Sequence, residues 1–456
     1  MNDTRKELLE ENPLKLMVKL SIPAIIGMLV VGLYSFMDAV FVGQMIGKEA
    51  MGAVSVAYPF TLMNNGVATL VGIGSASLLS RAIGKKDKFT VDKIMGNLIA
   101  LILLLSLVVS VVGIAFTRQI VAISGARGEI LELAVRYLKI IFLGSIFVNF
   151  AQSANMVMRG EGLLKKAMTI MGIGAVMNII LDPIFIYIMG EKGIEGAAIA
   201  TVISQISQAL MTYYYFKRKS SRVKINKISL QTAFLPQIFG VGVSAMLMQI
   251  MSMVQQTILY NSAAAYGSNE QIILMGATLR IQAFSFIPLW GMSQGMQPVV
   301  GTNYGAKAYD RVKKTTNTFI LGALALSLVF WIPIQSMPYS VLSLFIKDPA
   351  IVESGLTNFR LMYSVFPALA VMIMGLTFFQ SIGKGGKASV LVLLRQIILF
   401  IPLAWILPKL WGLKGVWLTS PITEGLVFLL TLVFIRLEYK KIDSLIQNPQ
   451  QKLKAK

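Results

Sequence analysis

Two acidic residues, Asp38 and Asp182, lie inside long apolar stretches of the chain. Asp182 belongs to the segment NIILDPIFIY, residues 178–187, in which Asn178 precedes it by four positions. Residues four apart lie one turn from each other on the same face of a helix, so this carboxyl and this amide are expected to act together. A charged side chain at the centre of a bilayer costs about 2.5–3.5 kcal/mol on insertion scales, which makes an intramembrane acid a candidate functional group.

Further oxygen atoms are available near this pair. Pro183 has no N–H, so the carbonyl of Ile179 lacks its helical donor. The simpler interpretation is that the acids only accept hydrogen bonds between helices. The residue types favour instead a site for a proton, or for a hard cation such as Na⁺, formed by Asp38, Asn178, Asp182 and Thr201.

The composition places these residues in a membrane. The 456 residues are 55% hydrophobic and 14% charged, with a mean hydropathy of +0.70, which is outside the range of soluble globular domains. Apolar stretches long enough to cross about 30 Å of hydrocarbon recur along the whole chain. They predict an all-α integral membrane protein with twelve transmembrane helices, at about 14–42, 50–80, 93–116, 131–157, 166–189, 194–217, 234–261, 271–302, 315–334, 351–381, 388–408 and 414–435.

The inventory of reactive side chains argues against an enzyme. The chain has neither cysteine nor histidine, which excludes thiolate nucleophiles, His-containing triads and the usual zinc or haem ligands. No Gly-Lys pair belongs to a phosphate-binding P-loop. We therefore expect no cofactor, and any work must be driven by an ion gradient.

The basic residues predict the orientation. With the N-terminus in the cytoplasm, 30 of the 42 Lys and Arg residues fall in inward-facing segments, seven in outward loops and five inside candidate helices. Both termini are then cytoplasmic, and the protein is expected in the cell (inner, cytoplasmic) membrane. The net charge of +21 is explained by this loop-by-loop bias, so no nucleic-acid partner is expected.

An internal repeat divides the chain into two halves. Shifting the first half by 221 residues aligns Gly84 with Gly305 and Lys86 with Lys307, and beyond a two-residue slip Pro183 aligns with Pro402. Two six-helix copies have the same orientation in the membrane, so they are expected to form lobes related by a pseudo-twofold axis along the membrane normal. The predicted parts are a first lobe at 1–218, a cytoplasmic linker at 219–230, a second lobe at 231–436 and a cytoplasmic basic tail at 437–456.

The halves differ at the two intramembrane acids. Asp182 aligns with Ile401 and Asp38 with Leu259. The second half is predicted to build the same helices without these carboxyls. The architecture therefore does not require them, which favours a specialised role in the first half.

Other residues are assigned from their type and position. Pro23 frees the carbonyl of Lys19 in the first helix and is either a hinge or a helix-entry proline. Arg280, Arg395 and Glu424 are charges inside second-half helices that could pair between lobes or bind anionic substrate groups. Uncharged amides suit a wet cavity better than lipid, so cavity-lining candidates are Gln152, Asn155, Gln205, Gln249, Gln255, Gln256 and Gln380.

Taken in order, six segments resemble multidrug and toxic compound extrusion (MATE) transporters, in particular the bacterial branch that contains the MepA and DinF exporters. The similarity covers almost the whole chain. It rests on IPAIIG, MDAVFVGQMIG, SRAIGKKD, MRGEG, NIILDP and GIEGAAIAT.

The resemblance implies export of small amphipathic, often cationic compounds in exchange for H⁺ or Na⁺. It also implies that Asp38, Asn178, Asp182 and Thr201 form the cation site and that Pro23 is the bending point. Tyr34, Asn155 and Met171 match cavity-lining positions of archaeal relatives, and Arg280 is a further lining candidate. The related NorM branch uses acids on its seventh and tenth helices, where this chain offers Gln255, Gln256 and the outer Glu353.

We therefore expect a proton-coupled antiporter, working as a monomer in the lipid bilayer by alternating access. A flippase for lipid-linked saccharides is the alternative, since such proteins have a similar helix arrangement. Its pyrophosphate cargo would need a cavity rich in Lys and Arg. A membrane receptor or enzyme that transports nothing is a third possibility, and the poor inventory of reactive side chains argues against it.

Overall fold

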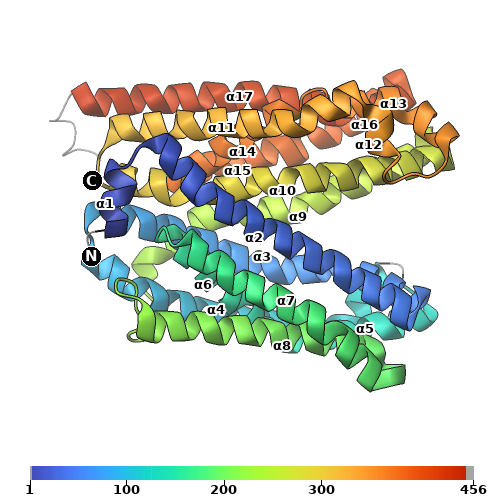
Figure 1. Ribbon diagram of the computed structural model, residues 1–456, viewed down its shortest axis with the longest axis horizontal. Coiled ribbons are helices and arrows are strands. Elements are labelled where there is room, and N and C mark those ends of the chain that lie inside the picture. The colour runs from blue at the N-terminus through green and yellow to red at the C-terminus, as the bar shows by residue number, and fades with distance from the viewer. Residues whose placement is uncertain (1–2, 125, 448–456) are drawn as a thin grey trace. The chain divides into compact units, whose positions relative to one another are not determined.

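The computed structural model describes residues 3–124 and 126–447, and every regular element in them is helical (Figure 1). The first part of the chain forms α1 (Asp3–Glu10), α2 (Pro13–Phe41), η1 (Val42–Ile46), α3 (Lys48–Lys85), α4 (Lys88–Ile123), α5 (Gly128–Leu143), α6 (Ser145–Gly160), α7 (Leu164–Met189), η2 (Gly190–Lys192), α8 (Gly193–Tyr214) and η3 (Tyr215–Lys219). The second part forms η4 (Thr232–Phe234), α9 (Leu235–Tyr266), α10 (Asn269–Gly305), α11 (Tyr309–Ser336), α12 (Pro338–Leu342), α13 (Pro349–Tyr363), α14 (Phe366–Ser381), α15 (Gly385–Leu393), η5 (Leu394–Ile398), α16 (Phe400–Trp411) and α17 (Leu413–Gln447).

The membrane helices agree with the twelve predicted from the sequence. Among the described residues, ten helical stretches are long and apolar enough to cross a membrane. One of these, Leu164–Lys219, contains both α7 and α8, which are joined by the turn at η2. The remaining helix consists of α5 and α6, each of which is too short alone because Gly144 separates them.

The fourth helix of each half is broken at the same place. Gly144 separates α5 from α6, and Ser364 and Val365 separate α13 from α14. Val365 is the residue that aligns with Gly144 at the 221-residue offset. In the second half Pro367 lies in the first turn of α14, where a proline is tolerated because its missing N–H would have no helical partner.

The backbone supports the repeat in a second way. Lys86 and Lys307 are the two non-glycine residues with positive φ in the described part of the chain, at 60° and 62°, and they occupy aligned positions. Gly162 and Gly383, also aligned, have φ of 90° and 78°. A left-handed residue after a helix ends it sharply, so both halves make the same turn at these points.

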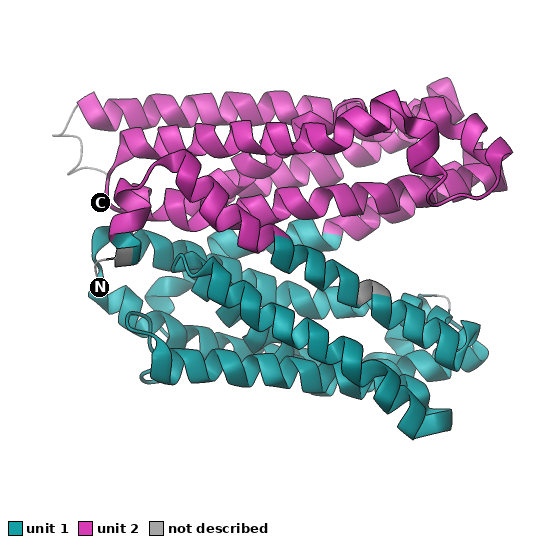
Figure 2. Ribbon diagram, in the orientation of Figure 1, with its two compact units in different colours: residues 1–5, 26–250 teal, residues 6–25, 251–456 magenta. Residues whose placement is uncertain are grey.

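Two compact units make up the chain (Figure 2). Unit 1 contains residues 1–5 and 26–250, and unit 2 contains residues 6–25 and 251–456. The division falls inside α2 and inside α9, whereas the sequence-based division was placed at 219–230. The tail predicted at 437–456 is helical as far as Gln447, and its last nine residues lie outside the described part.

The core of unit 1 is built on α3, which is buried on almost all sides. A side chain on Gly160 would meet the backbone of Ala76 at 2.9 Å, so α6 and α3 approach closely at this point. The hydroxyl of Ser153 donates to the carbonyl of Ala68 at 3.0 Å across the same interface. Small residues and interhelical hydrogen bonds are the usual means of packing helices in lipid, where no hydrophobic effect drives them together.

The predicted linker is packed onto unit 1. Val223 and Ile225 are buried in the same apolar cluster as α3 and α4. The amide of Gln231 donates to the side chain of Asn97 at 2.7 Å. Gly96 leaves room for the carbonyl of Lys227, which any side chain at position 96 would displace.

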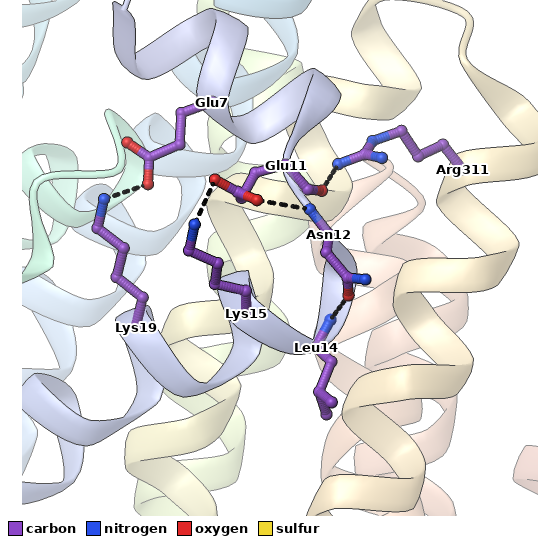
Figure 3. Close-up of polar contacts among 7 residues, drawn as sticks. All are labelled: Glu7, Glu11, Asn12, Leu14, Lys15, Lys19 and Arg311. Atoms are coloured by element: carbon purple, nitrogen blue, oxygen red, sulfur yellow. Dashed lines mark hydrogen bonds and ion pairs between the residues drawn. The ribbon is translucent and has the colours of Figure 1, made fainter.

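The N-terminal segment of unit 2 is held by polar contacts (Figure 3). Arg311 on α11 donates to the carbonyl of Glu11. Asn303 on α10, which the figure does not draw, donates to the carbonyl of Leu8 at 2.9 Å. The side chain of Asn12 accepts from the amide of Leu14 and so caps the start of α2. These contacts fix the start of the helix that carries Pro23 and Asp38.

Candidate cation-coupling site

The fifth helix of unit 1, α7, carries the predicted pair on one face. Asp182 is fully buried and Asn178 is 2% exposed. The amide of Asn178 donates to Asp182 Oδ1 at 2.9 Å, as the four-residue spacing predicts, and approaches Thr201 Oγ1 on α8 at 3.4 Å. Three of the four predicted residues are therefore in direct contact.

Asp38 on α2 completes the group. Its carboxyl lies close enough to the carboxyl of Asp182 for the two to form a hydrogen bond. Such a bond requires a proton, because two ionised carboxylates offer only acceptors and repel each other. A pair of acids in this arrangement is therefore suited to hold one proton between them.

The site retains free acceptor capacity. Asp38 Oδ1, Asp182 Oδ2 and Asn178 Oδ1 are buried and have no hydrogen-bond partner among the described residues. α7 continues as an α-helix through Pro183, so the carbonyl of Ile179 also lacks its helical donor. Carboxylate, amide and carbonyl oxygens are what a proton or a hard cation requires, and these residues fit either.

Tyr137 on α5 belongs to this group, and the sequence reasoning missed it. Its side chain is 6% exposed and lies close enough to Asp38, Asp182 and Tyr34 to interact with them electrostatically. A tyrosine in an apolar helix usually marks the membrane interface, so its residue type alone gave no signal. The internal repeat does give a signal. The residue aligned with Tyr137 in the second half is Asn358, so the shared fold does not require a tyrosine at this position.

Pro23 lies in α2 close to the point where the two units divide. Up to Ile25 the helix packs within unit 2, where Gly291 leaves room for the backbone of Ile25. From Ile26 onward it packs within unit 1, where Gly27 lies against the side chain of Met168. A proline at this transition suits a hinge, because the helix there lacks one hydrogen bond.

The predicted cavity-lining residues of unit 1 divide into two groups. Tyr34, Gln152 and Met171 are partly exposed. Asn155 is buried and donates to the carbonyl of Ala167 at 2.7 Å, so its amide joins α6 to α7. Gln205 on α8 is also buried, and its Oε1 has no partner among the described residues.

The predicted charges inside the helices of unit 2 differ in their partners. Arg395 donates twice to Glu424 Oε1, from Nε at 2.9 Å and from the terminal nitrogen at 2.6 Å. Both belong to unit 2, so they are paired with each other. Arg280 and Gln256, by contrast, have exposed side chains.

Another buried carboxyl lies outside the membrane helices, in the turn between α6 and α7. Glu161 is 3% exposed. Burial raises its pKa to about 7, although the positive charges of Arg222 and Lys166 act in the opposite direction. This residue lies at the end of unit 1 where the linker is packed.

The chain is similar to known membrane transporters over nearly its full length. It matches the MatE family over residues 23–184 and 244–406. It is 29% identical over 440 residues to the multidrug export protein MepA of Staphylococcus aureus (strain MRSA252), covering 96% of this chain and 97% of that protein.

Solved structures agree. A MATE structure in the bent conformation has 27% identity and a TM-score of 0.91, covering 98% of this chain and 100% of that chain. The MATE multidrug transporter DinF-BH, solved with a ligand bound, has 33% identity and a TM-score of 0.85, covering 92% of this chain and 95% of that chain. MATE transporters have twelve helices in two lobes.

Proposed function

Since the chain belongs to the MatE family of multidrug transporters, we propose that it exports amphipathic organic compounds in exchange for protons. The observation that carries the proposal is the close approach of the carboxyls of Asp38 and Asp182. A hydrogen bond between these two carboxyls would join α2 to α7, and it exists only while a proton is present.

The geometry suggests how proton binding moves a helix. When the shared proton leaves, two carboxylates in contact repel each other in a medium of low dielectric constant, and α2 is driven from α7. Pro23 lets the half of α2 that carries Asp38 bend independently of the half that packs within unit 2. Protonation from outside would draw the carboxyls together and release cargo, and loss of the proton inside would restore the cargo-binding state.

A proton is favoured over Na⁺ as the coupling ion. The two carboxyls lie within reach of a shared proton, and a sodium ion between them would have to replace that hydrogen bond with metal–oxygen contacts. Asn178 and Thr201 orient the pair, since Asn178 contacts both Asp182 and Thr201.

The setting proposed for this activity is the cytoplasmic membrane, with both termini in the cytoplasm and one chain as the transporting unit. The distribution of Lys and Arg supports the orientation. The flippase alternative loses support, because a pyrophosphate cargo needs several cations. Of the two arginines considered for it, Arg395 is neutralised by Glu424, so Arg280 remains.

The experiment is dye efflux from proteoliposomes under a proton gradient and, separately, under a sodium gradient. Wild-type protein should move a cationic dye under the proton gradient alone. Asp182→Asn should reduce proton-driven efflux at least about a hundredfold while the protein elutes from gel filtration like the wild type. Sodium-driven efflux in the wild type, or full efflux from Asp182→Asn, would overturn the coupling scheme.

A further inference from the structure

Unit 2 exposes a cation within a membrane-spanning helix. Arg280 is the twelfth residue of α10, about 16 Å from the start of the helix along its axis. Its side chain is exposed and has neither a hydrogen bond nor an ion pair with any residue that the structure describes. The span as a whole is apolar. A guanidinium at this depth requires water or an anionic partner.

The internal repeat separates Arg280 from cations that the fold itself tolerates. Lys139 on α5 and Arg360 on α13 are also exposed, each twelfth in its helix, and they align with each other at the 221-residue offset. A cation that recurs in both halves belongs to the shared architecture. Arg280 aligns with Pro59, so the first half has no counterpart to it.

The residues around Arg280 suit recognition of an anion. α9 and α10 run antiparallel, joined by Gly267 and Ser268. A side chain on Gly276 would lie 3.4 Å from the hydroxyl of Tyr260, so these two positions face each other. One turn farther from the hairpin the same register brings Gln256 opposite Arg280, and both are exposed.

Apolar surface flanks this polar group. Ile273 and Phe284 lie on the same face of α10 as Arg280, at spacings of seven and four residues, and are 48% and 57% exposed. The arrangement offers a guanidinium, an amide and a phenol between apolar side chains. It is complementary to an amphipathic molecule that carries an anionic group.

Glutamate and aspartate side chains that could compete for Arg280 are neutralised, buried or distant along the helix. Glu424 is occupied by Arg395, and Asp182 is fully buried in unit 1. Glu270, the acid in the first turn of α10, is ten residues from Arg280, which is about 15 Å along the helix. The exposed charge on this face of unit 2 is therefore positive.

We propose that Arg280, together with Gln256 and Tyr260, binds the anionic group of an amphipathic cargo, so that the transporter accepts zwitterionic and anionic compounds such as carboxylates. The inference rests on the proposed function and narrows its cargo. The guanidinium donates two hydrogen bonds to a carboxylate, the amide of Gln256 adds a third, and the apolar residues hold the hydrophobic body.

The test compares two dyes that differ in one group. Rhodamine 6G is a cationic ethyl ester, and hydrolysis of the ester gives a free acid with a carboxylate. Binding of each dye to the purified full chain in detergent is measured by fluorescence anisotropy. The wild type should bind the free acid more tightly, and Arg280→Gln should weaken binding of the free acid about tenfold or more without weakening binding of the ester.

Two further variants make the result specific. Arg280→Lys keeps the charge but loses the planar fork, so its affinity for the free acid should fall between the wild type and Arg280→Gln. Lys139→Gln, which removes an exposed cation of unit 1, should leave the preference unchanged. The assignment would be refuted if Arg280→Gln weakened the binding of both dyes equally. It would also be refuted if Lys139→Gln reduced the preference for the free acid as much as Arg280→Gln does.

Failure of this inference differs from failure of the proposed function. If the dyes bind with the predicted preference but neither moves under a proton gradient, transport is refuted and the anion site is supported. If the dyes move and Arg280→Gln discriminates between them no less than the wild type, the anion site is refuted and transport is supported.

Discussion

The fifth and sixth helices of the two halves have the same place in the repeat but hold different polar groups. In unit 1, α7 and α8 contain Asp182 and Asn178, and no basic side chain among the described residues neutralises the carboxyl. In unit 2, α15 to α17 contain Arg395 and Glu424, which neutralise each other. The first arrangement changes charge when a proton arrives or leaves, whereas the second keeps both charges.

The helices differ along with the side chains. α7 passes through Pro183 as an α-helix, whereas before the aligned Pro402 the helix widens into the π-helical turn η5. The wider turn alters the pairing of the backbone carbonyls, and Gln255 on α9 donates to the carbonyl of Arg395 at 3.4 Å. One fold thus accommodates either a titratable acid or a fixed ion pair at this point.

The largest effect on stability is expected from breaking the fixed pair. Glu424→Gln leaves the guanidinium of Arg395, whose side chain is only 14% exposed, without a counter-charge, which costs about 3 kcal/mol. Asp182→Asn replaces the carboxyl by an isosteric amide and should leave stability within about 1 kcal/mol of the wild type. Unfolding of both variants in detergent, followed by the loss of helical circular dichroism, measures the difference.

A compensating variant sharpens this comparison. Replacing Arg395 and Glu424 together, by Met and Gln, removes both charges and should recover most of the stability that Glu424→Gln loses. Proton-driven efflux by the double variant should persist, because the coupling acids lie in unit 1. If Glu424→Gln is as stable as Asp182→Asn, the ion pair of unit 2 contributes no more to stability than the carboxyl of unit 1.

A smaller effect concerns Glu161, whose pKa is raised to about 7 by burial. Below about pH 4.5 the carboxyl holds its proton in the folded and the unfolded chain. As the pH rises to about 7, the unfolded chain releases the proton first, so the free energy of unfolding falls, by up to about 3 kcal/mol. Above that range both states are ionised and the loss is complete.

Glu161→Gln removes this dependence. The variant should show a flatter stability profile than the wild type between about pH 5 and 8 and should be the more stable protein at about pH 8. Melting temperatures in detergent across that range measure both profiles. Glu129→Gln, at an exposed position on α5, is the matched control and should follow the wild type. Parallel profiles for Glu161→Gln and the wild type would contradict the expected titration.

The smallest effect compares two helix starts at aligned positions. Asp87 caps α4 in unit 1, where its carboxylate accepts from the amide of Thr90 at 3.1 Å, whereas the aligned Ala308 leaves α11 without a side-chain cap. Asp87→Ala should cost about 1 kcal/mol, and Ala308→Asp should add a similar or smaller amount. Opposite shifts in melting temperature are expected, and shifts in the same direction would show that the starts are not equivalent.

Much of the local structure could be read from the sequence. The length and spacing of the apolar stretches predicted twelve membrane helices, because backbone groups in lipid must bond within their own segment. The contact between Asn178 and Asp182 followed from a spacing of four residues on one helix. The comparison of the two halves separated residues that the fold requires from those it does not.

Contacts between distant segments were harder to predict. The roles of Arg395 and Glu424, which are 29 residues apart, stayed open because several pairings were compatible with their positions. Tyr137 was missed for the same reason, since nothing near it in the chain distinguishes it from a tyrosine at the lipid surface.

By itself, the amino-acid sequence determined where the helices run, how the repeat divides them and that two acids lie within the apolar stretches, because hydropathy and periodicity are local properties. Tertiary structure alone decided that the carboxyls of Asp38 and Asp182 lie close together, that Arg395 is neutralised and that Arg280 is not. Which charge meets which depends on how helices pack side by side, and in lipid that packing is set by the shapes of side chains far apart in the sequence.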